Sequence, residues 1–524
     1  PPSWLASHEV GPPWPQEPTI AHLPGAGEAG APAPQLAPAP VLGAPARAAA
    51  SRPLPSLAEG PPTAFGTVSV VLPCAEEREL AIKTASRFCE RTPEDWLAEI
   101  LVVDDGSSPP LVELFKEKGF NMERCKVRML RHEVTTGLMN AKQTGGRNAK
   151  GDVVAFFDCH VSPKPGWADE IFAKIRANPR RMVVPAITDL DLDTFDEKVN
   201  SAVNAKCYLT WDADFKWFDD ESDYIPTISG GLVAMSRWWF NATGGFDDVM
   251  RGWGGENLDQ SLRSWLCGGE IMRAKTSRIA HMWRTGDSRT RAHYHGRGGH
   301  VDNRARVVAA WYDVFAEKYQ GRKIQQDEVK NYDPVKESLG CKPFAFFLWR
   351  FRHVYIDAGV IPERVFHIRE KTSGLCLSFG WGGLALEGCD ESKKKQVVQL
   401  GNQDQEEKGG KCCSGIRMFG SNDCLDYVKD GVPHTYSCDV TGRNTNQHYR
   451  WRPDGTIEKG LGPSKTCFGK PMAGLLSKKV AVGSCDPAAA GQYEMWGDKV
   501  PHERELYESE VRRLGYDKLD MPDN

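Results

Sequence analysis

The chain has 524 residues, more than a single hydrophobic core usually accommodates, so two or more domains are expected. Its 66 Lys and Arg against 70 Asp and Glu give a formal net charge of −4 without a long basic stripe, which argues against a nucleic-acid partner. No apolar run approaches the roughly 20 residues of a membrane span. The chain begins with Pro1 rather than Met, so membrane attachment is expected only through a segment absent from this chain.

Residues 1–62 are rich in Pro, Ala and Gly, which predicts an extended stem or linker because such a composition cannot bury enough apolar area to fold. Over residues 63–345, apolar runs such as TVSVVLP, AEILVVDD and DVVAFFD alternate with amphipathic helical stretches. This alternation is typical of parallel strands that helices cover on both faces, so we predict an α/β, Rossmann-like domain. Ligands of such sheets bind beyond the carboxyl ends of the strands.

Acidic side chains follow two of these strands. Asp158 and His160 project to the same side of an extended segment, so both can reach one point beyond the sheet edge. A carboxylate beside an imidazole accepts Mn²⁺; the alternative is a solvated aspartate beside a hydrogen-bonded histidine. Asp104 and Asp105 in VDDGSS could contact a nucleotide, although Asp-Asp-Gly is as common in ordinary turns.

Glycine-rich segments lie farther along the same domain. Gly230 and Gly231 precede an apolar strand and allow the backbone to approach a ligand closely. In RGWGGEN, Trp253 and paired glycines lead to Glu256 and Asn257 at the start of a helix. Glu256 is a candidate ligand-binding carboxylate, or it simply interacts with the positive end of the helix dipole.

After residue 362 the sequence changes to short strands and many glycines. Cys-bounded segments that begin at Cys376, Cys424 and Cys467 imply a threefold all-β domain over residues 363–498. Residues 346–362 are predicted to be an interdomain linker, and residues 499–524 a polar C-terminal tail or surface helix. The 15 cysteines suit an oxidising compartment such as the lumen of the secretory pathway.

The segments DVVAFFDCH, TISGGLVAM, WGGENLDQSLRSWLCGG and SRIAHMWR, in this order and with these gaps, resemble the polypeptide N-acetylgalactosaminyltransferases, which start mucin-type O-glycans. The similarity covers roughly residues 66–498, and the Trp-Gly-Gly-Glu-Asn block is its most specific part. The three Cys-bounded repeats resemble the ricin-type β-trefoil lectin of that family. The resemblance therefore implies a GT-A glycosyltransferase domain followed by a β-trefoil lectin domain.

The resemblance also implies a reaction. Family members bind Mn²⁺ through an Asp-x-His pair and a later histidine, here Asp158, His160 and His281, and the ion bridges the diphosphate of UDP-N-acetylgalactosamine (UDP-GalNAc). GalNAc then passes, with retention, to a Ser or Thr hydroxyl of a polypeptide. The residues expected to act in catalysis are Trp253, Glu256 and Asn257. The expected contacts of the UDP-sugar are Asp104, Asp105, Asp158, Cys159, Gly230, Gly231, Trp253, Arg284, His293 and Tyr294.

A sugar site is implied in the lectin domain as well. The middle repeat retains the aspartate, aromatic ring and asparagine of a ricin-type pocket as Asp426, Tyr436 and Asn446, whereas Ser378 and Gly469 replace the aspartate in the other repeats. A working pocket would hold GalNAc already attached to a peptide; the alternative is that all three repeats only pack against the catalytic domain. Four disulfides are implied by the resemblance: Cys267–Cys341, Cys376–Cys389, Cys424–Cys438 and Cys467–Cys485.

Some positions depart from the family. Cys159 stands where the family has serine, Pro73 replaces a threonine that contacts uridine, and Thr135 replaces an arginine. An alternative function is therefore a catalytically degenerate, lectin-like binding protein on a glycosyltransferase scaffold. The complete set of metal ligands favours the enzyme, with Ser/Thr-rich peptides and GalNAc-glycopeptides as partners. The expected location is the Golgi lumen, as the luminal part of a type II membrane protein.

Overall fold

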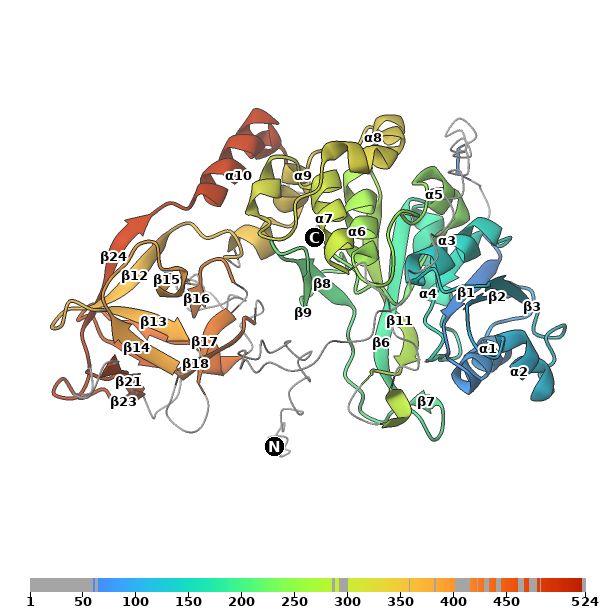
Figure 1. The fold of residues 1–524 in the computed structure, drawn as a ribbon, viewed down its shortest axis with the longest axis horizontal. Coiled ribbons are helices and arrows are strands. Elements are labelled where there is room, and N and C mark those ends of the chain that lie inside the picture. The colour runs from blue at the N-terminus through green and yellow to red at the C-terminus, as the bar shows by residue number, and fades with distance from the viewer. Residues whose placement is uncertain are drawn as a thin grey trace, which may run out of the picture.

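The computed structural model of this chain describes residues 60–61, 65–284, 288–291, 300–357, 359–380, 383–400, 415–421, 423–427, 433–439, 444–459, 466–470, 478–480 and 482–520. The predicted stem therefore lies almost wholly outside the described residues. Within these ranges, no helix is both long enough and apolar enough to cross a lipid bilayer. The chain forms an N-terminal α/β domain and a C-terminal all-β domain (Figure 1).

A mixed sheet in the order β3-β2-β1-β4-β10-β6-β11-β5 organises the α/β domain. The strands β3, β2, β1 and β4 are parallel, whereas β10 runs antiparallel to both of its neighbours. The strands are β1 (Val68–Cys74), β2 (Leu97–Asp105), β3 (Val127–His132), β4 (Val153–Phe156), β5 (Val161–Pro163), β6 (Arg181–Asp191), β7 (Asp196–Glu197), β10 (Val233–Ser236) and β11 (Glu270–His281), with a separate hairpin of β8 (Lys206–Leu209) and β9 (Phe215–Phe218).

Helices cover both faces of this sheet. Along β1, Val70 and Leu72 pack with α1, α2 and α4, whereas Val71 between them packs with α3, α5 and α6. This period of two confirms the predicted strands buried on both faces. The helices are α1 (Glu79–Arg91), α2 (Leu111–Glu117), α3 (Leu138–Asn148), α4 (Asp169–Ala177), α5 (Arg237–Ala242), α6 (Glu256–Leu266), α7 (His300–Trp311), α8 (Asp333–Leu339) and α9 (Phe344–Arg350).

Most of residues 346–357 and 359–362 pack into the core of the α/β domain, so the prediction of an interdomain linker there is wrong. Phe347 and Leu348 of α9 are fully buried, and Tyr355 and Ile361 are buried in the same cluster. The hydrophobic effect explains this placement, because the run FAFFLWRF is too apolar to lie in an exposed connection. The crossing to the next domain is confined to the few residues before β12.

The C-terminal domain is built from strands that, in the part of the chain described, pair antiparallel around their own hydrophobic cluster. This arrangement agrees with the expected all-β domain. Its strands are β12 (Val365–Glu370), β13 (Cys376–Gly380), β14 (Gly383–Glu387), β15 (Val397–Leu400), β16 (Ile416–Met418), β17 (Asp423–Tyr427), β18 (Pro433–Ser437), β19 (Tyr449–Trp451), β20 (Ile457–Lys459), β21 (Thr466–Phe468), β22 (Lys478–Lys479), β23 (Val482–Ser484) and β24 (Tyr493–Lys499).

All four expected disulfides are present: Cys267–Cys341, Cys376–Cys389, Cys424–Cys438 and Cys467–Cys485. Two further disulfides, which the sequence analysis left unassigned, are Cys74–Cys159 and Cys89–Cys125 in the α/β domain. Among the described cysteines, Cys207 is a free and buried thiol. This extent of cross-linking agrees with folding in an oxidising compartment.

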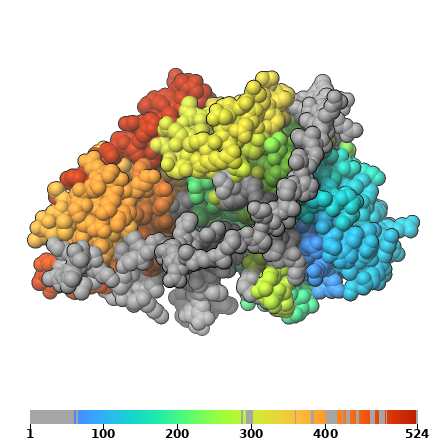
Figure 2. All heavy atoms as spheres, in the orientation of Figure 1, coloured from blue at the N-terminus to red at the C-terminus, as the bar shows by residue number. Residues whose placement is uncertain are grey.

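The segment after β24 is a docked helix rather than a free tail. It forms α10 (His502–Arg513), which returns to the α/β domain and buries Tyr507 and Val511 in the cluster that contains α9. The Nζ atom of Lys318 lies 3.0 Å from Glu503 Oε2 at this contact. Figure 2 shows α10, in red, reaching from the orange C-terminal domain to the yellow α9 region. The two domains are thus joined twice, before β12 and after β24.

Candidate active site

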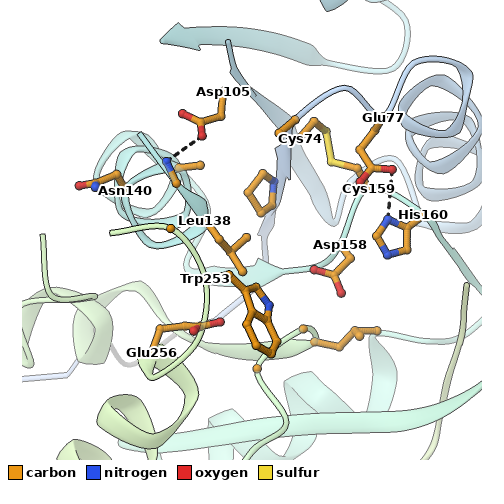
Figure 3. Close-up of a pocket in the computed structure, with 18 of the residues that line it drawn as sticks. Cys74, Glu77, Asp105, Leu138, Asn140, Asp158, Cys159, His160, Trp253 and Glu256 are labelled. Carbon is orange, nitrogen blue, oxygen red and sulfur yellow. Dashed lines mark hydrogen bonds and ion pairs between the residues drawn. A yellow bond between two sulfur atoms is a disulfide. The ribbon is translucent and has the colours of Figure 1, made fainter. Parts of the chain in front are cut away.

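A cavity of about 1090 Å³ lies beyond the carboxyl ends of β1, β2 and β4, where a parallel sheet usually binds its ligand. Figure 3 shows side chains from these strand ends and from the start of α6 facing this space. The predicted site residues that line it are Asp105, Asp158, Cys159, His160, Gly230, Gly231, Trp253, Glu256, His281 and Arg284. Asp104 and Asn257 do not line the cavity, and His293 and Tyr294 lie outside the described residues.

Asp158, His160 and His281 converge on one side of the cavity. Asp158 and His160 follow β4, and His281 ends β11, which pairs with β5 so that His281 lies opposite Val161. One potential ligand atom from each side chain lies within 4.8 Å of the others, and His281 Nε2 is 3.1 Å from Asp158 Oδ2. One carboxylate and two imidazoles form a donor set that suits Mn²⁺ or a similar divalent ion.

The electrostatics of this cluster also fit a cation. Burial acts to raise the pKa of Asp158, but the hydrogen bond with His281 and the electrostatic attraction of His160, His281 and Lys142 outweigh it, so the pKa lies well below its usual range. Burial lowers the pKa of His281, although Asp158 opposes this shift. An ionised carboxylate facing an imidazole that tends to be neutral is the protonation state that metal ligation requires.

Glu77 is a site residue that the sequence analysis did not identify. It lies just after β1, lines the cavity, and places Oε2 3.2 Å from His160 Nδ1 and Oε1 2.6 Å from Arg284 Nη2. Burial acts to raise the pKa of Glu77, but the effects of His160 and Arg284 are larger and opposite. The pKa therefore lies below its usual value, and the carboxylate stays charged. A carboxylate on Nδ1 leaves Nε2 of His160 for a metal. The signal in the sequence was its position after a parallel strand.

We expect Glu77→Gln to weaken Mn²⁺ binding about 10- to 100-fold, because partners that orient a ligating histidine commonly contribute that much. Electron paramagnetic resonance of free Mn²⁺ measures the affinity directly. Glu76→Gln is the matched control, because Glu76 instead accepts a hydrogen bond from the Ser108 backbone N–H. Equal affinities for the two variants would contradict this role of Glu77.

Gly231 is required next to Asp158. A Cβ atom at position 231 would lie 2.5 Å from Asp158 Oδ2, closer than two such atoms can approach. Gly230 adopts a φ of +109° and lies against Glu256 and Asn257 of α6. The glycine pair thus lets one segment pack against both Asp158 and the start of α6. The predicted close approach of this segment to a bound ligand stays a prediction.

We therefore expect Gly231→Ala to displace the Asp158 carboxylate and to reduce activity about 10²-fold, because a misplacement of about 1 Å at a reacting centre has that cost. Gly66→Ala is the control, since its Cβ would find its nearest neighbour at 4.0 Å. Steady-state kinetics and Mn²⁺ titration of both variants test this expectation. Unchanged metal affinity in Gly231→Ala would show that the side chain can be accommodated.

Glu256 is held at the opposite side of the cavity by Lys142. The Nζ atom of this fully buried lysine donates to the Gly230 carbonyl oxygen at 2.6 Å and lies 3.5 Å from Glu256 Oε1. The other oxygen, Oε2, is buried and has no hydrogen-bond partner in the described part of the chain. Asn257 donates to the Ile228 carbonyl oxygen at 3.0 Å, so it holds the 228–231 segment rather than facing the cavity. Glu256 is thus the available acceptor for a ligand hydroxyl.

The two aspartates at the end of β2 have different roles. Asp105 faces the cavity, where its carboxylate accepts hydrogen bonds from the Thr136 and Gly137 backbone N–H groups at 2.9 Å. Asp104 accepts from the Ser107 and Leu111 backbone N–H groups, both at 3.0 Å, and forms an ion pair with Arg131. Because its oxygens are committed to the start of α2, we exclude Asp104 from the proposed nucleotide contacts.

Aromatic rings form the rim of the cavity. Trp253 is 46% exposed and Trp217 of β9 is 37% exposed, although both line the cavity. The ring of Trp217 packs edge-on against Trp283, which in turn contacts His281 with ring centroids 4.4 Å apart. These rings present apolar surface beside the candidate metal ligands.

In the middle repeat of the C-terminal domain, side-chain amides hold the aspartate of the expected sugar pocket. The Asp426 carboxylate accepts from Asn444 Nδ2 at 2.9 Å and from Gln447 Nε2 at 3.0 Å. Asn446, which was predicted to complete the sugar pocket, is exposed, and its backbone N–H donates to Asn444 Oδ1. Tyr436 on β18 is 37% exposed. The asparagine that meets Asp426 is therefore Asn444, because the turn before β19 points that side chain inward.

Comparison with known proteins places the fold. Residues 69–239 match the model of the family "Glycosyl transferase family 2", and residues 219–285 match "N-terminal domain of galactosyltransferase". A crystal structure of GalNAc-T7 with UDP, GalNAc and Mn²⁺ superposes with a TM-score of 0.51 at 20% identity, covering 82% of this chain and 81% of that one. The fold and site thus define the class: a GT-A glycosyltransferase domain that carries a C-terminal lectin-like domain.

Relatives of known family identify the chain further. Polypeptide N-acetylgalactosaminyltransferase 8 of Drosophila melanogaster is 30% identical over 410 residues, which are 73% of this chain and 68% of that protein. Inactive polypeptide N-acetylgalactosaminyltransferase-like protein 5 of Macaca fascicularis is 31% identical over 309 residues, 55% of this chain and 68% of that protein. The chain belongs to the polypeptide N-acetylgalactosaminyltransferase family, as the sequence motifs indicated. It spans 61% of the length of human polypeptide N-acetylgalactosaminyltransferase 13, to which it is 27% identical.

Proposed function

We propose that this protein transfers GalNAc from UDP-GalNAc to Ser or Thr hydroxyls of polypeptides, with retention, in the presence of Mn²⁺. The observation that carries the proposal is the convergence of Asp158, His160 and His281 in a cavity that also contains the buried carboxylate of Glu256. A scaffold that had lost turnover would have no need to keep this set together. The relatives belong to the same family, and two of the three described above are named as transferases.

The side chains divide the task between them. Bound Mn²⁺ would stabilise the negative charge of the diphosphate as the sugar bond breaks. Asp158, His160 and His281 would hold it, and the Arg284 guanidinium, kept at the cavity wall by Glu77, would face the same phosphates. Glu256 would accept a hydrogen bond from a sugar hydroxyl. The protein would thus act by positioning and charge stabilisation.

The acceptor is proposed to lie across the aromatic rim formed by Trp217, Trp253 and Trp283. A prior GalNAc on the same polypeptide would bind the middle repeat of the C-terminal domain at Asp426, supported by Asn444 and Gln447. The proposed location is the Golgi lumen, which suits the disulfides of both domains.

Mass spectrometry after incubation with Mn²⁺, a panel of UDP-sugars, and bare or GalNAc-bearing Ser/Thr peptides tests this proposal. We expect a peptide mass gain of one N-acetylhexosamine with UDP-GalNAc, and none when a chelator removes the metal. Nucleotide binding without mass gain for any donor and acceptor pair would instead favour the alternative of a binding protein on a transferase scaffold. One relative, named inactive, makes this control necessary.

A further inference from the structure

The disulfide Cys74–Cys159 lies inside the active site. Cys74 is the last residue of β1, and Cys159 is the residue between the two metal-ligand candidates Asp158 and His160. Both cysteines are buried, with exposed fractions of 0% and 1%, and both contribute to the cavity wall (Figure 3). The cross-link therefore joins the end of one strand to the metal-binding segment itself.

The position of this link matters because β1 and β4 separate at this point. Their parallel register ends at Val71 opposite Phe156, and the last backbone hydrogen bond runs from the Phe157 N–H to the Val71 carbonyl oxygen at 3.0 Å. Beyond it, β1 continues beside β2 as far as Cys74, whereas residues 158–160 leave the sheet toward β5. The disulfide spans the two diverging segments with a Cα–Cα distance of 5.6 Å.

Backbone hydrogen bonds hold the same segment on its other sides. Thr84 Oγ1 of α1 donates to the Cys159 carbonyl oxygen at 3.0 Å and accepts from the Val161 N–H at 3.1 Å. The Met282 N–H donates to the His160 carbonyl oxygen at 3.1 Å. Hydrogen bonds from α1 and from Met282, just after β11, thus hold two sides of residues 158–160, and the disulfide connects this segment to β1.

The disulfide also affects the position of Glu77, because Cys74 lies close to this residue in the chain. This residue lies three positions after Cys74, and its carboxylate contacts His160 on one side and Arg284 on the other. Movement of the β1 end away from Cys159 would therefore shift Asp158, His160 and the partner of His160 at the same time.

We propose that Cys74–Cys159 is a positioning cross-link of the metal site, one that sets the distance between the ligand segment and the end of β1. This inference rests on the proposed function in one respect, namely that the bound ion is Mn²⁺. The cysteines are positioning residues, since they act through Asp158, His160 and Glu77.

The test compares two double variants of the full chain, Cys74→Ala/Cys159→Ala and Cys89→Ala/Cys125→Ala. The second removes the other disulfide of the α/β domain that the sequence did not assign, which ties α1 to the segment before β3 and does not line the cavity. Electron paramagnetic resonance measures the Kd of Mn²⁺ with and without UDP. We expect about 10-fold or greater weakening for the first variant, and an affinity like that of the unmodified protein for the second. Saturating Mn²⁺ should restore most of the kcat of the first variant, which simple unfolding would not allow.

Reduction of the unmodified protein provides a measurement that does not depend on the variant folding. Dithiothreitol converts the disulfide to two thiols and is itself oxidised to its cyclic disulfide; mass spectrometry with thiol alkylation identifies which pair has opened. Mn²⁺ affinity should fall in step with opening of Cys74–Cys159 and not with opening of Cys89–Cys125. Equal Kd values for both double variants and the unmodified protein would overturn the inference alone. Failure of the unmodified protein to bind Mn²⁺ would overturn the proposed function together with it.

Discussion

Asp158→Asn is expected to lower kcat/KM by about 10³-fold or more, because a bound divalent ion contributes several kcal/mol to stabilising charge in the transition state. The substitution preserves size but removes the charge that Asp158 brings to within 3.1 Å of His281. Mn²⁺ affinity should fall with activity, whereas the α/β fold should remain, since Asp158 holds no backbone hydrogen bond that the structure records. On the same preparation, steady-state kinetics measure activity, electron paramagnetic resonance measures Mn²⁺ affinity, and circular dichroism reports on the fold.

The matched control is Asp152→Asn, a carboxylate at the opposite end of the same strand region. Its Oδ2 accepts from the Gly66 and Thr67 backbone N–H groups at 2.9 and 3.0 Å, so its loss should affect stability and leave Mn²⁺ affinity unchanged. If Asp158→Asn kept full metal affinity, the metal site assigned to the strand ends would be incorrect.

Glu256→Gln is expected to lower kcat/KM for transfer by about 10²- to 10³-fold, the usual effect of losing one charge-stabilising or positioning group in a buried site. The buried Oε2 has no protein partner among the described atoms, so a sugar hydroxyl is its natural donor, and an amide nitrogen there cannot accept. The substitution also leaves Lys142 beside a neutral group. Binding of UDP alone, measured by calorimetry, should change little because the proposed nucleotide contacts lie elsewhere in the cavity.

Glu99→Gln serves as the control for burying an amide in place of a carboxylate. Glu99 is equally buried but lies near the start of β2, where it pairs with Ser69 and Arg128. Comparable losses of transfer activity in the two variants would indicate that Glu256 is needed for stability rather than for the sugar.

The positions of two of the three candidate metal ligands could be predicted from the sequence pattern. Asp158 and His160 are two residues apart at the end of an apolar run, and the period of two in an extended chain puts both on one side. Gly230 and Gly231 were predicted to allow close approach to a bound ligand, whereas the structure shows close packing of Gly231 against the Asp158 side chain. His281 could be placed beside them only by resemblance, since 121 residues separate it from His160.

Other assignments required the packed structure. Asp104 and Asp105 are adjacent and chemically identical, yet one caps α2 and the other faces the cavity, because successive side chains of a strand point to opposite sides. Most of residues 346–357 and 359–362 lie in the core because their aromatic side chains pack against the helices of the α/β domain. Asn444, which the sequence did not single out, donates to Asp426 because a turn directs its side chain inward.

The sequence by itself thus determined the alternating α/β pattern, the all-β repeats and the acidic strand ends, since these depend on local period and composition. Only the tertiary structure decided that Glu77 supports His160 and Arg284, and that Cys74 pairs with Cys159. Such contacts depend on where the neighbouring strands β1 and β4 diverge at their carboxyl ends. That geometry is set by long-range packing, and no local pattern of residues encodes it.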